Sequence, residues 1–192
     1  MSSKLDIINA SFILLGHRSV NNLGDNSGED VKKASKLYDI FYPAYLTRYS
    51  WRFAIKQFEL SQVANAPEVS GYNYAYQLPS DYLSIYKVDP QAQYEIYGTY
   101  LYINISSDLK LYYTYKVSEG ILPEYFVEWI IEEFAALFAM PITQQVELAQ
   151  LWGQSAQLKL NRAIALDSQS QTSLSIISNP LGQAKYAFTP GL

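Results

Sequence analysis

The sequence predicts an α+β protein: a helical bundle of about four helices with an inserted small antiparallel β-domain and an extended C-terminal arm. Apolar residues recur at helical spacing near both ends of the chain, whereas the middle alternates in hydropathy and holds most of the tyrosines. The final segment carries one charged residue and no sustained periodicity, which is typical of a chain without local structure. The predicted organisation is N-terminal helices in 1–50, a β-domain in 51–117, a helix pair in 118–168 and the arm in 169–192.

Two helices are predicted before residue 50. Ser3 and Asp6 have the spacing of a capping box and Gly16 is a natural helix end, so the first helix lies between them. A polar loop leads to a second helix over about 27–50, in which Pro43 should introduce a kink or a break. Three lysines lie mainly opposite the apolar stripe of this second helix, and we name them the lysine edge: Lys32, Lys33 and Lys36.

The tyrosine-rich middle of the chain is predicted to form strands. Residues 72–115 hold 12 of the 18 tyrosines, and Tyr97-Gly98-Thr99-Tyr100 has the composition of a hairpin turn. Tyrosines in this pattern have three interpretations: strand pairing and core, a protein interface, or a surface that stacks sugars or bases. The expected strands cover 53–61, 73–78, 83–88, 93–97, 100–105 and 109–117.

A pair of helices is predicted after the strands. Pro123 suits the first turn of a largely apolar helix over 123–139, and Pro141 should end that helix. Thr143 has the side chain to cap a last helix, which runs to about Ser168. The two helices are expected to pack against each other as a hairpin.

Three glutamates of the first helix in this pair share one face, because Glu124, Glu128 and Glu132 recur every four residues. Like charges at this spacing repel each other by a few tenths of a kcal/mol per pair. Three interpretations stay open: a solvated face, a catalytic dyad, or pairing with the lysine edge within the subunit or on a neighbour.

The composition argues against an enzyme. The chain has one histidine, His17, and no cysteine, and it lacks the glycine-rich phosphate loops and the Gly-x-Ser-x-Gly elbow. No catalytic, cofactor or metal site is predicted, and a carboxylate-dependent glycosidase is a distant candidate. A net charge of -4 lacks the basic footprint of a protein that grips nucleic acid. Charged residues make up only 17% of the chain, which favours a surface partly covered by partners.

No membrane association is expected. The longest apolar run, from Phe134 to Ile142, is interrupted by Pro141 and is too short to cross a bilayer. The first residues lack the charged segment followed by an apolar stretch that marks a signal peptide. The sequence therefore predicts a soluble protein that is made in a cytoplasm.

Four segments in a fixed order give the chain a family resemblance. They are Tyr49-Ser50-Trp51-Arg52-Phe53-Ala54, Gln77-Leu78-Pro79-Ser80-Asp81-Tyr82-Leu83, Tyr97-Gly98-Thr99-Tyr100-Leu101-Tyr102 and Leu122-Pro123-Glu124-Tyr125-Phe126. Together with the order of helices and strands, they make residues 5–170 resemble the tail tubular protein A family, the head-to-tail adaptor of short-tailed bacteriophages. Two positions depart from the pattern: Ser50 stands where related chains often carry proline, and Pro43 is unusual inside the second helix.

The resemblance implies a structural virion protein of the tail, placed at the portal vertex. It implies a homo-oligomeric ring, usually of twelve subunits, that binds the portal protein and offers a platform to the tail nozzle protein. Double-stranded DNA would pass through the lumen during ejection without specific binding, and an acidic wall suits such passage.

Three surfaces are expected to serve this assembly. The subunit interface would pair the lysine edge with Glu124, Glu128 and Glu132 of a neighbour. The tail-partner surface would use Tyr97, Tyr100 and Tyr102. The portal-docking arm would use its apolar side chains, Leu174, Ile176, Ile177, Leu181, Tyr186 and Phe188. The alternative from another class is a small aromatic-faced carbohydrate-binding accessory protein, which would bind saccharides as a monomer.

Overall fold

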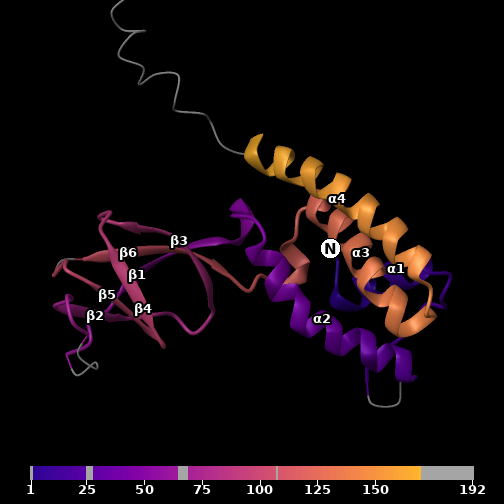
Figure 1. The fold of residues 1–192 in the computed structure, drawn as a ribbon, viewed down its shortest axis with the longest axis horizontal. Helices are drawn as coiled ribbons and strands as arrows, with labels where there is room; N and C mark the ends of the chain where they lie inside the picture. Colours follow the sequence, from indigo (N-terminus) through magenta and orange to yellow (C-terminus); the bar gives the residue numbers. More distant parts are fainter. Residues whose placement is uncertain (1, 25–27, 65–68, 107, 170–192) are drawn as a thin grey trace, which may run out of the picture.

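Helices and strands segregate along the chain and in space. The computed structural model describes residues 2–24, 28–64, 69–106 and 108–169, and among these residues a pair of helices precedes the strands and another pair follows them (Figure 1). The α+β prediction is confirmed, and the predicted arm, 169–192, lies outside the described residues except for Gln169, which ends the last helix. The helices are α1 (Lys4–Leu14), α2 (Glu29–Thr47), α3 (Glu124–Phe138) and α4 (Val146–Gln169). The strands are β1 (Ile55–Leu60), β2 (Tyr74–Gln77), β3 (Tyr82–Asp89), β4 (Tyr94–Tyr97), β5 (Tyr100–Ile103) and β6 (Leu109–Tyr115).

The first helix begins and ends as predicted. The Ser3 hydroxyl accepts a hydrogen bond from the Asp6 amide at 3.2 Å, and the Asp6 carboxylate accepts one from the Ser3 amide at 2.9 Å. At the other end Gly16 has a φ of +71°, and the His17 amide donates back to the Phe12 carbonyl at 2.8 Å. This left-handed glycine with its backward hydrogen bond is a Schellman motif, so both ends of α1 are fixed by local chemistry.

Helix α2 runs unbroken through Pro43, so the prediction of a break is wrong. Proline lacks the N–H that would bond to the carbonyl four residues earlier, here Asp39. Asp39 is exposed, and its carbonyl can therefore bond to water instead. The buried side chains on both sides of the proline, Tyr38, Tyr42 and Leu46, keep the helix against the core.

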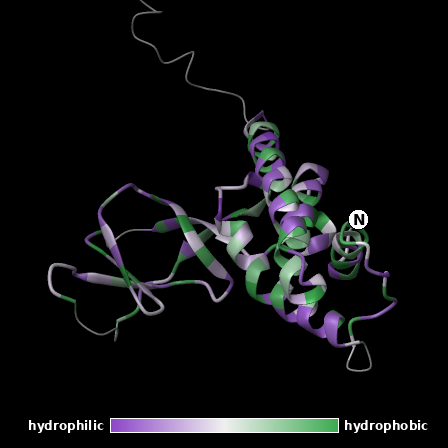
Figure 2. Cartoon of the chain, turned by 45° about the vertical axis from the view of Figure 1, so that its right-hand side comes forward, coloured by the Kyte–Doolittle hydropathy of each residue, from purple (hydrophilic) through white to green (hydrophobic). Residues whose placement is uncertain are grey.

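Helix α3 is the centre of the helical bundle. It packs on α1, α2 and α4, and its buried aromatic side chains form a continuous cluster with those of α2 and with Trp51. The ring of Tyr38 stacks on Phe134 with centroids 4.6 Å apart. Helices α3 and α4 pack against each other as the predicted hairpin. A Cβ added at Gly153 of α4 would meet the Cβ of Ala136 at 4.0 Å, an ordinary contact, so this packing does not require a glycine there. Figure 2 shows hydrophobic residues alternating with hydrophilic ones along these helices.

The connection between α3 and α4 differs from the prediction. The chain continues past Phe138 as a π turn, Ala139–Thr143, and α4 begins only at Val146. The Thr143 hydroxyl donates to the Ala139 carbonyl at 2.7 Å, so it is engaged by the π turn. The same oxygen accepts a hydrogen bond from the Gln145 amide at 3.4 Å. Because α4 begins only at Val146, Thr143 lies too early to be its N-cap, and Gln144 between them has a φ of +58°.

The strands form two three-stranded antiparallel sheets, in the orders β1-β6-β3 and β2-β5-β4. All six predicted strands are confirmed, with ends that agree within two residues. A bridge between Gln62 and Tyr76 connects the first sheet to the second, and both sheets cover one small core. The predicted hairpin turn joins β4 to β5, where Gly98 supplies the positive φ of +61° that a two-residue turn requires.

The first testable prediction concerns Pro43. Pro43→Ala restores a helical N–H at a position whose backbone is already helical, so we expect the free energy of unfolding to rise by about 1–3 kcal/mol. Urea unfolding followed by circular dichroism measures it. Pro79→Ala, in the connection between β2 and β3, is the matched control and should bring no gain, because no helical hydrogen bond is missing there. If Pro43→Ala is no more stable than the unchanged chain, then the hydrogen bond that Pro43 lacks does not destabilise α2.

Candidate interaction surfaces and a polar pocket

The three glutamates predicted to share a face of α3 have different surroundings. Glu124 and Glu128 are exposed, whereas Glu132 is only 6% exposed. The Lys159 ammonium of α4 donates to the Glu132 carboxylate at 2.8 Å. Arg48, after α2, pairs in the same way with the neighbouring Glu133. Glu132 is therefore engaged within the subunit, and the interface prediction concerns Glu124 and Glu128.

The lysine edge lies at the start of α2. Lys32 and Lys33 pair with acids one turn earlier on their own helix, at 3.8 Å from Glu29 and 3.2 Å from Asp30. Lys36 forms no ion pair with any residue that the structure describes. Within the described chain the lysine edge does not pair with the glutamates of α3. Pairing within the subunit, one of the interpretations left open by the sequence, is therefore not observed.

The lysine edge also borders a shallow concavity of about 400 Å³. Its other lining residues come from the polar loop before α2 and from the helix itself: Leu23, Gly24, Glu29 and Ser35. A cationic hollow of this kind complements an exposed acidic helix face, such as the one formed by Glu124 and Glu128.

The three tyrosines of the predicted tail-partner surface do lie together. Tyr97 and Tyr100 flank the turn between β4 and β5, and the ring of Tyr102 lies 5.8 Å from Tyr97 and 6.4 Å from Tyr100 between centroids. Their exposures differ, at 51% for Tyr97 and 3% for Tyr102. Tyr102 is therefore buried and packs against the other two rings, whereas the Tyr97 ring is accessible to a partner. The hydrogen bond from Tyr97 to Glu95, together with the charge of Glu95, raises the pKa of the Tyr97 hydroxyl.

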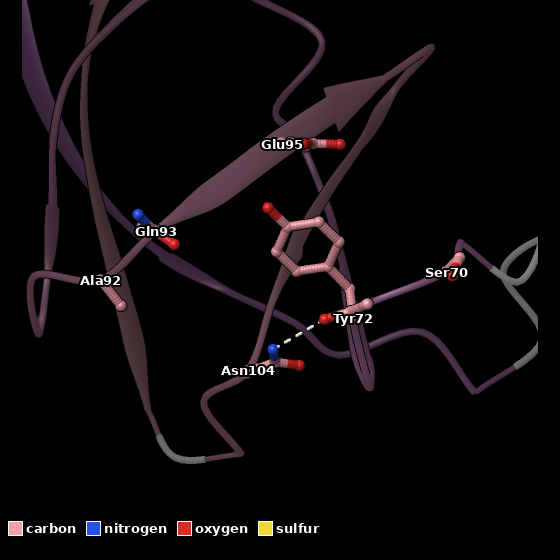
Figure 3. Close-up of a pocket in the computed structure, with 7 residues that line it drawn as sticks. Ser70, Tyr72, Ala92, Gln93, Glu95 and Asn104 are labelled. Carbon is pink, nitrogen blue, oxygen red and sulfur yellow. Dashed lines mark hydrogen bonds between the residues drawn. The ribbon is translucent and has the colours of Figure 1, made fainter.

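A polar pocket of about 490 Å³ opens beside this cluster (Figure 3). Figure 3 shows the Tyr72 ring in the pocket, with Glu95 beyond its hydroxyl end and Asn104 near its backbone. The Asn104 side chain donates to the Gly71 carbonyl and accepts from the Asn73 amide, both at 2.8 Å. Partial burial and the neighbouring Glu95 raise the pKa of Tyr72. The lining consists of Ser70, Gly71, Tyr72, Ala92, Gln93, Glu95 and Asn104, and sequence reasoning did not single it out.

The helical bundle and the sheets meet at a buried carboxylate that the sequence analysis also missed. Asp167 in the last turn of α4 is fully buried. Its carboxylate accepts hydrogen bonds from the Arg52 amide at 3.1 Å and from the Tyr125 hydroxyl at 2.8 Å. Burial and the adjacent Asp167 raise the pKa of Tyr125, which stays a protonated donor. We name this contact, together with the packing of Trp51 between Phe126 and Trp129, the junction.

The remaining predicted site residues belong to the arm. Its six apolar residues all lie outside the described residues. Across residues 2–24, 28–64, 69–106 and 108–169, no group of His, Asp and Glu side chains is arranged to hold a metal ion. None of the helices in these ranges has the length and hydropathy of a bilayer-spanning segment.

Comparison with known proteins identifies no family: no protein-family model and no curated protein sequence matches the chain. The resemblance to phage adaptors therefore depends on the order of the four sequence segments.

The second testable prediction concerns the junction. Asp167→Ala leaves a partly buried amide and a partly buried hydroxyl without their acceptor, so we expect a loss of about 1–3 kcal/mol in the free energy of unfolding. Asp167→Asn keeps one acceptor oxygen and should lose roughly half as much. Urea unfolding compares the two variants. A change below about 0.5 kcal/mol in Asp167→Ala, the size usual for a surface position, would contradict the role given to this carboxylate.

Proposed function

We propose that this chain is a structural subunit of a virion, the ring-forming adaptor that joins the portal vertex of a short-tailed phage to its tail nozzle. The observation that carries the proposal is the order of the four segments that resemble the adaptor family. Each of the four segments includes a turn or a boundary between secondary-structure elements. Trp51 lies at the junction, Pro79 between β2 and β3, Gly98 in the β4–β5 turn and Pro123 before α3.

The outer face of α4 supports assembly with other proteins. Leu151 and Leu158 are seven residues apart and are 55% and 72% exposed. The exposed side chains between the two leucines are uncharged amides, Gln154 and Gln157. One turn beyond either leucine the surface becomes charged, at Glu147 and Arg162. Low charge around exposed leucines is typical of the central part of a protein interface, because charged side chains are costly to bury there. This face suits contact with a neighbouring copy in a ring.

Charge also supports a head-to-tail ring. A ring needs two different complementary surfaces on each subunit. The exposed glutamates at the start of α3 and the lysine edge with its concavity provide opposite charges on separate helices. A net charge of -4 per subunit would make the closed ring strongly negative, so that its wall would repel DNA and allow the duplex to slide.

The third testable prediction concerns the charged interface. Changing Lys32, Lys33 and Lys36 to Glu should block ring formation at low salt, because like charges would then face each other. Adding Glu124→Lys and Glu128→Lys to that variant should restore rings, since the attraction is re-formed with reversed signs. Mass photometry counts the subunits.

Two results would count against this interface. If the variant with Lys32, Lys33 and Lys36 changed to Glu still forms normal rings, then the lysine edge is not part of the subunit interface. Equal loss of rings in a control with Lys110→Glu and Lys116→Glu, which lie on β6 and just after it, would show that net charge alone is responsible.

The fourth testable prediction concerns the arm. Deleting residues 171–192 should leave a folded subunit, because every helix and strand of the described structure ends by Gln169. The truncated subunit should no longer bind portal protein, since a segment that orders on docking contributes its contacts only in the complex. A pull-down with portal protein measures this. If portal protein retains the truncated subunit as well as the full chain, then the arm is not needed for docking.

A second candidate function is saccharide binding by a monomer, and the polar pocket favours it. An aromatic ring flanked by side-chain amides and a carboxylate is a set that recognises sugars, and Tyr72, Gln93, Glu95 and Asn104 provide one. Calorimetric titration with common mono- and oligosaccharides distinguishes the two functions. Saturable binding that Tyr72→Ala abolishes, in a chain that remains monomeric beside portal protein, would replace the adaptor proposal with this one.

A further inference from the structure

A second concavity, of about 370 Å³, lies on the β1-β6-β3 sheet beside the junction. Along β6 the buried Leu111 and Tyr113 point to the core, so Tyr112 between them faces outward. The pairing register places Gln57 and Lys87 on either side of Tyr112, in one row across the three strands. Neighbouring strands are about 4.8 Å apart, so the backbones of these two flanking residues are roughly 10 Å apart. The lining consists of Arg52, Ile55, Gln57, Tyr86, Lys87 and Tyr112.

Two cations line this concavity without a carboxylate partner. Neither Arg52 nor Lys87 takes part in an ion pair with any residue that the structure describes. The Lys87 ammonium instead lies 4.2 Å from the centroid of the Tyr112 ring. A cation–π contact holds an ammonium in place but leaves its charge uncompensated, unlike a salt bridge. The concavity therefore presents a fixed positive charge to a ligand.

Arg52 fixes the other end of the concavity. Its backbone amide is bonded to the buried Asp167, so its position is set by the junction. The residue is half-buried. Arg52 has no ion-pair partner among the described residues, so its guanidinium is available to an anion, and a charge-assisted hydrogen bond between them would be favourable.

Carboxylates limit the size of the anion. The next outward-facing row of the sheet contains Glu59, Lys110 and Asp89, in which one lysine lies between two acids. These acids lie two residues along β1 and β3 from Gln57 and Lys87, roughly 7 Å away. A long polyanion running in that direction would be repelled, so the positive region suits one or two phosphate groups.

An accessible aromatic ring completes the site. Tyr86 is 44% exposed, and no cation of the described residues lies over its ring, whereas Lys87 lies over the ring of Tyr112. Nucleic-acid bases stack on exposed tyrosines irrespective of sequence. The amide of Gln57 can donate to and accept from the edge of a base. The volume lies at the small end of the range for ligand pockets, where a single nucleotide fits.

We propose that this concavity binds a nucleotide unit, with the phosphate between Arg52 and Lys87 and the base against Tyr86. The unit comes either from a free nucleotide or from a single strand of nucleic acid. The proposal is independent of the adaptor function, because it uses neither the lysine edge nor the arm.

Nuclear magnetic resonance titration of the ¹⁵N-labelled full chain with thymidine monophosphate tests the proposal. We expect saturable shifts centred on the backbone amides of Gln57, Tyr86 and Lys87. Lys87→Gln and Arg52→Gln should each weaken binding at least roughly tenfold, because each removes one charged contact to the phosphate. The matched control is Lys110→Gln, which removes the same charge from the same sheet face and should change the affinity by less than about twofold. Lys87 is at the surface, so Lys87→Gln decides the question if the Arg52 variant does not fold.

Further ligands separate the components of the site and the source of the unit. Thymidine without phosphate should bind at least roughly tenfold more weakly than the monophosphate. A thymidine hexanucleotide that binds more tightly than the monophosphate would identify a strand as the source, and equal affinity would identify the free nucleotide. Inorganic phosphate that binds as tightly as the monophosphate would overturn the contact between base and Tyr86. Tighter binding of a hexaglutamate peptide, or an unchanged affinity in Lys87→Gln, would overturn the proposal.

Discussion

The hydrogen bonds of Asp167 are the contact on which the arrangement of this molecule depends. A carboxylate in the last turn of a helix meets the negative end of the helix dipole, and full burial adds the cost of lost hydration. Asp167 is stable there because the Arg52 amide and the Tyr125 hydroxyl both donate to it. These donors belong to the chain entering the sheets and to the first turn of α3. One side chain of α4 therefore connects α3 to the chain that enters the sheets. The packing of Trp51 and the hydrogen bond from the Tyr42 hydroxyl to the Val117 carbonyl, at 2.8 Å, strengthen the same boundary.

The surfaces that we assign to function lie on different helices and strands. The ionic contacts of Glu132 and Glu133 use Lys159 and Arg48 inside the subunit, so the acids left at the surface of α3 are those nearest its start. The lysine edge lies at the start of α2 and remains available to a neighbour. The tyrosine cluster and the polar pocket lie on the second sheet. The charged, amide-rich and aromatic surfaces therefore lie on different elements, as the proposed adaptor with several partners would need.

Local features of the structure could be predicted from the sequence, and contacts between distant residues could not. The six strands follow from alternating hydropathy, and both ends of α1 follow from Ser3, Asp6 and Gly16, because those signals act within a few residues. Glu132 was expected at the surface because its partner Lys159 lies on another helix. Thr143 was predicted to cap the last helix, but it ends the π turn and α4 begins three residues later. Pro43 was predicted to kink or split the second helix, and α2 continues through it with buried side chains on both sides.

The adaptor function is the central claim, and mass photometry of the full chain mixed with portal rings tests it most directly. The account predicts a new species, heavier than the portal ring by a closed set of the 21.8 kDa chains, with twelve copies expected. The charge-reversed and truncated variants provide the comparison in the same experiment. A chain that stays monomeric at every concentration while the mass of the portal ring is unchanged would contradict the account.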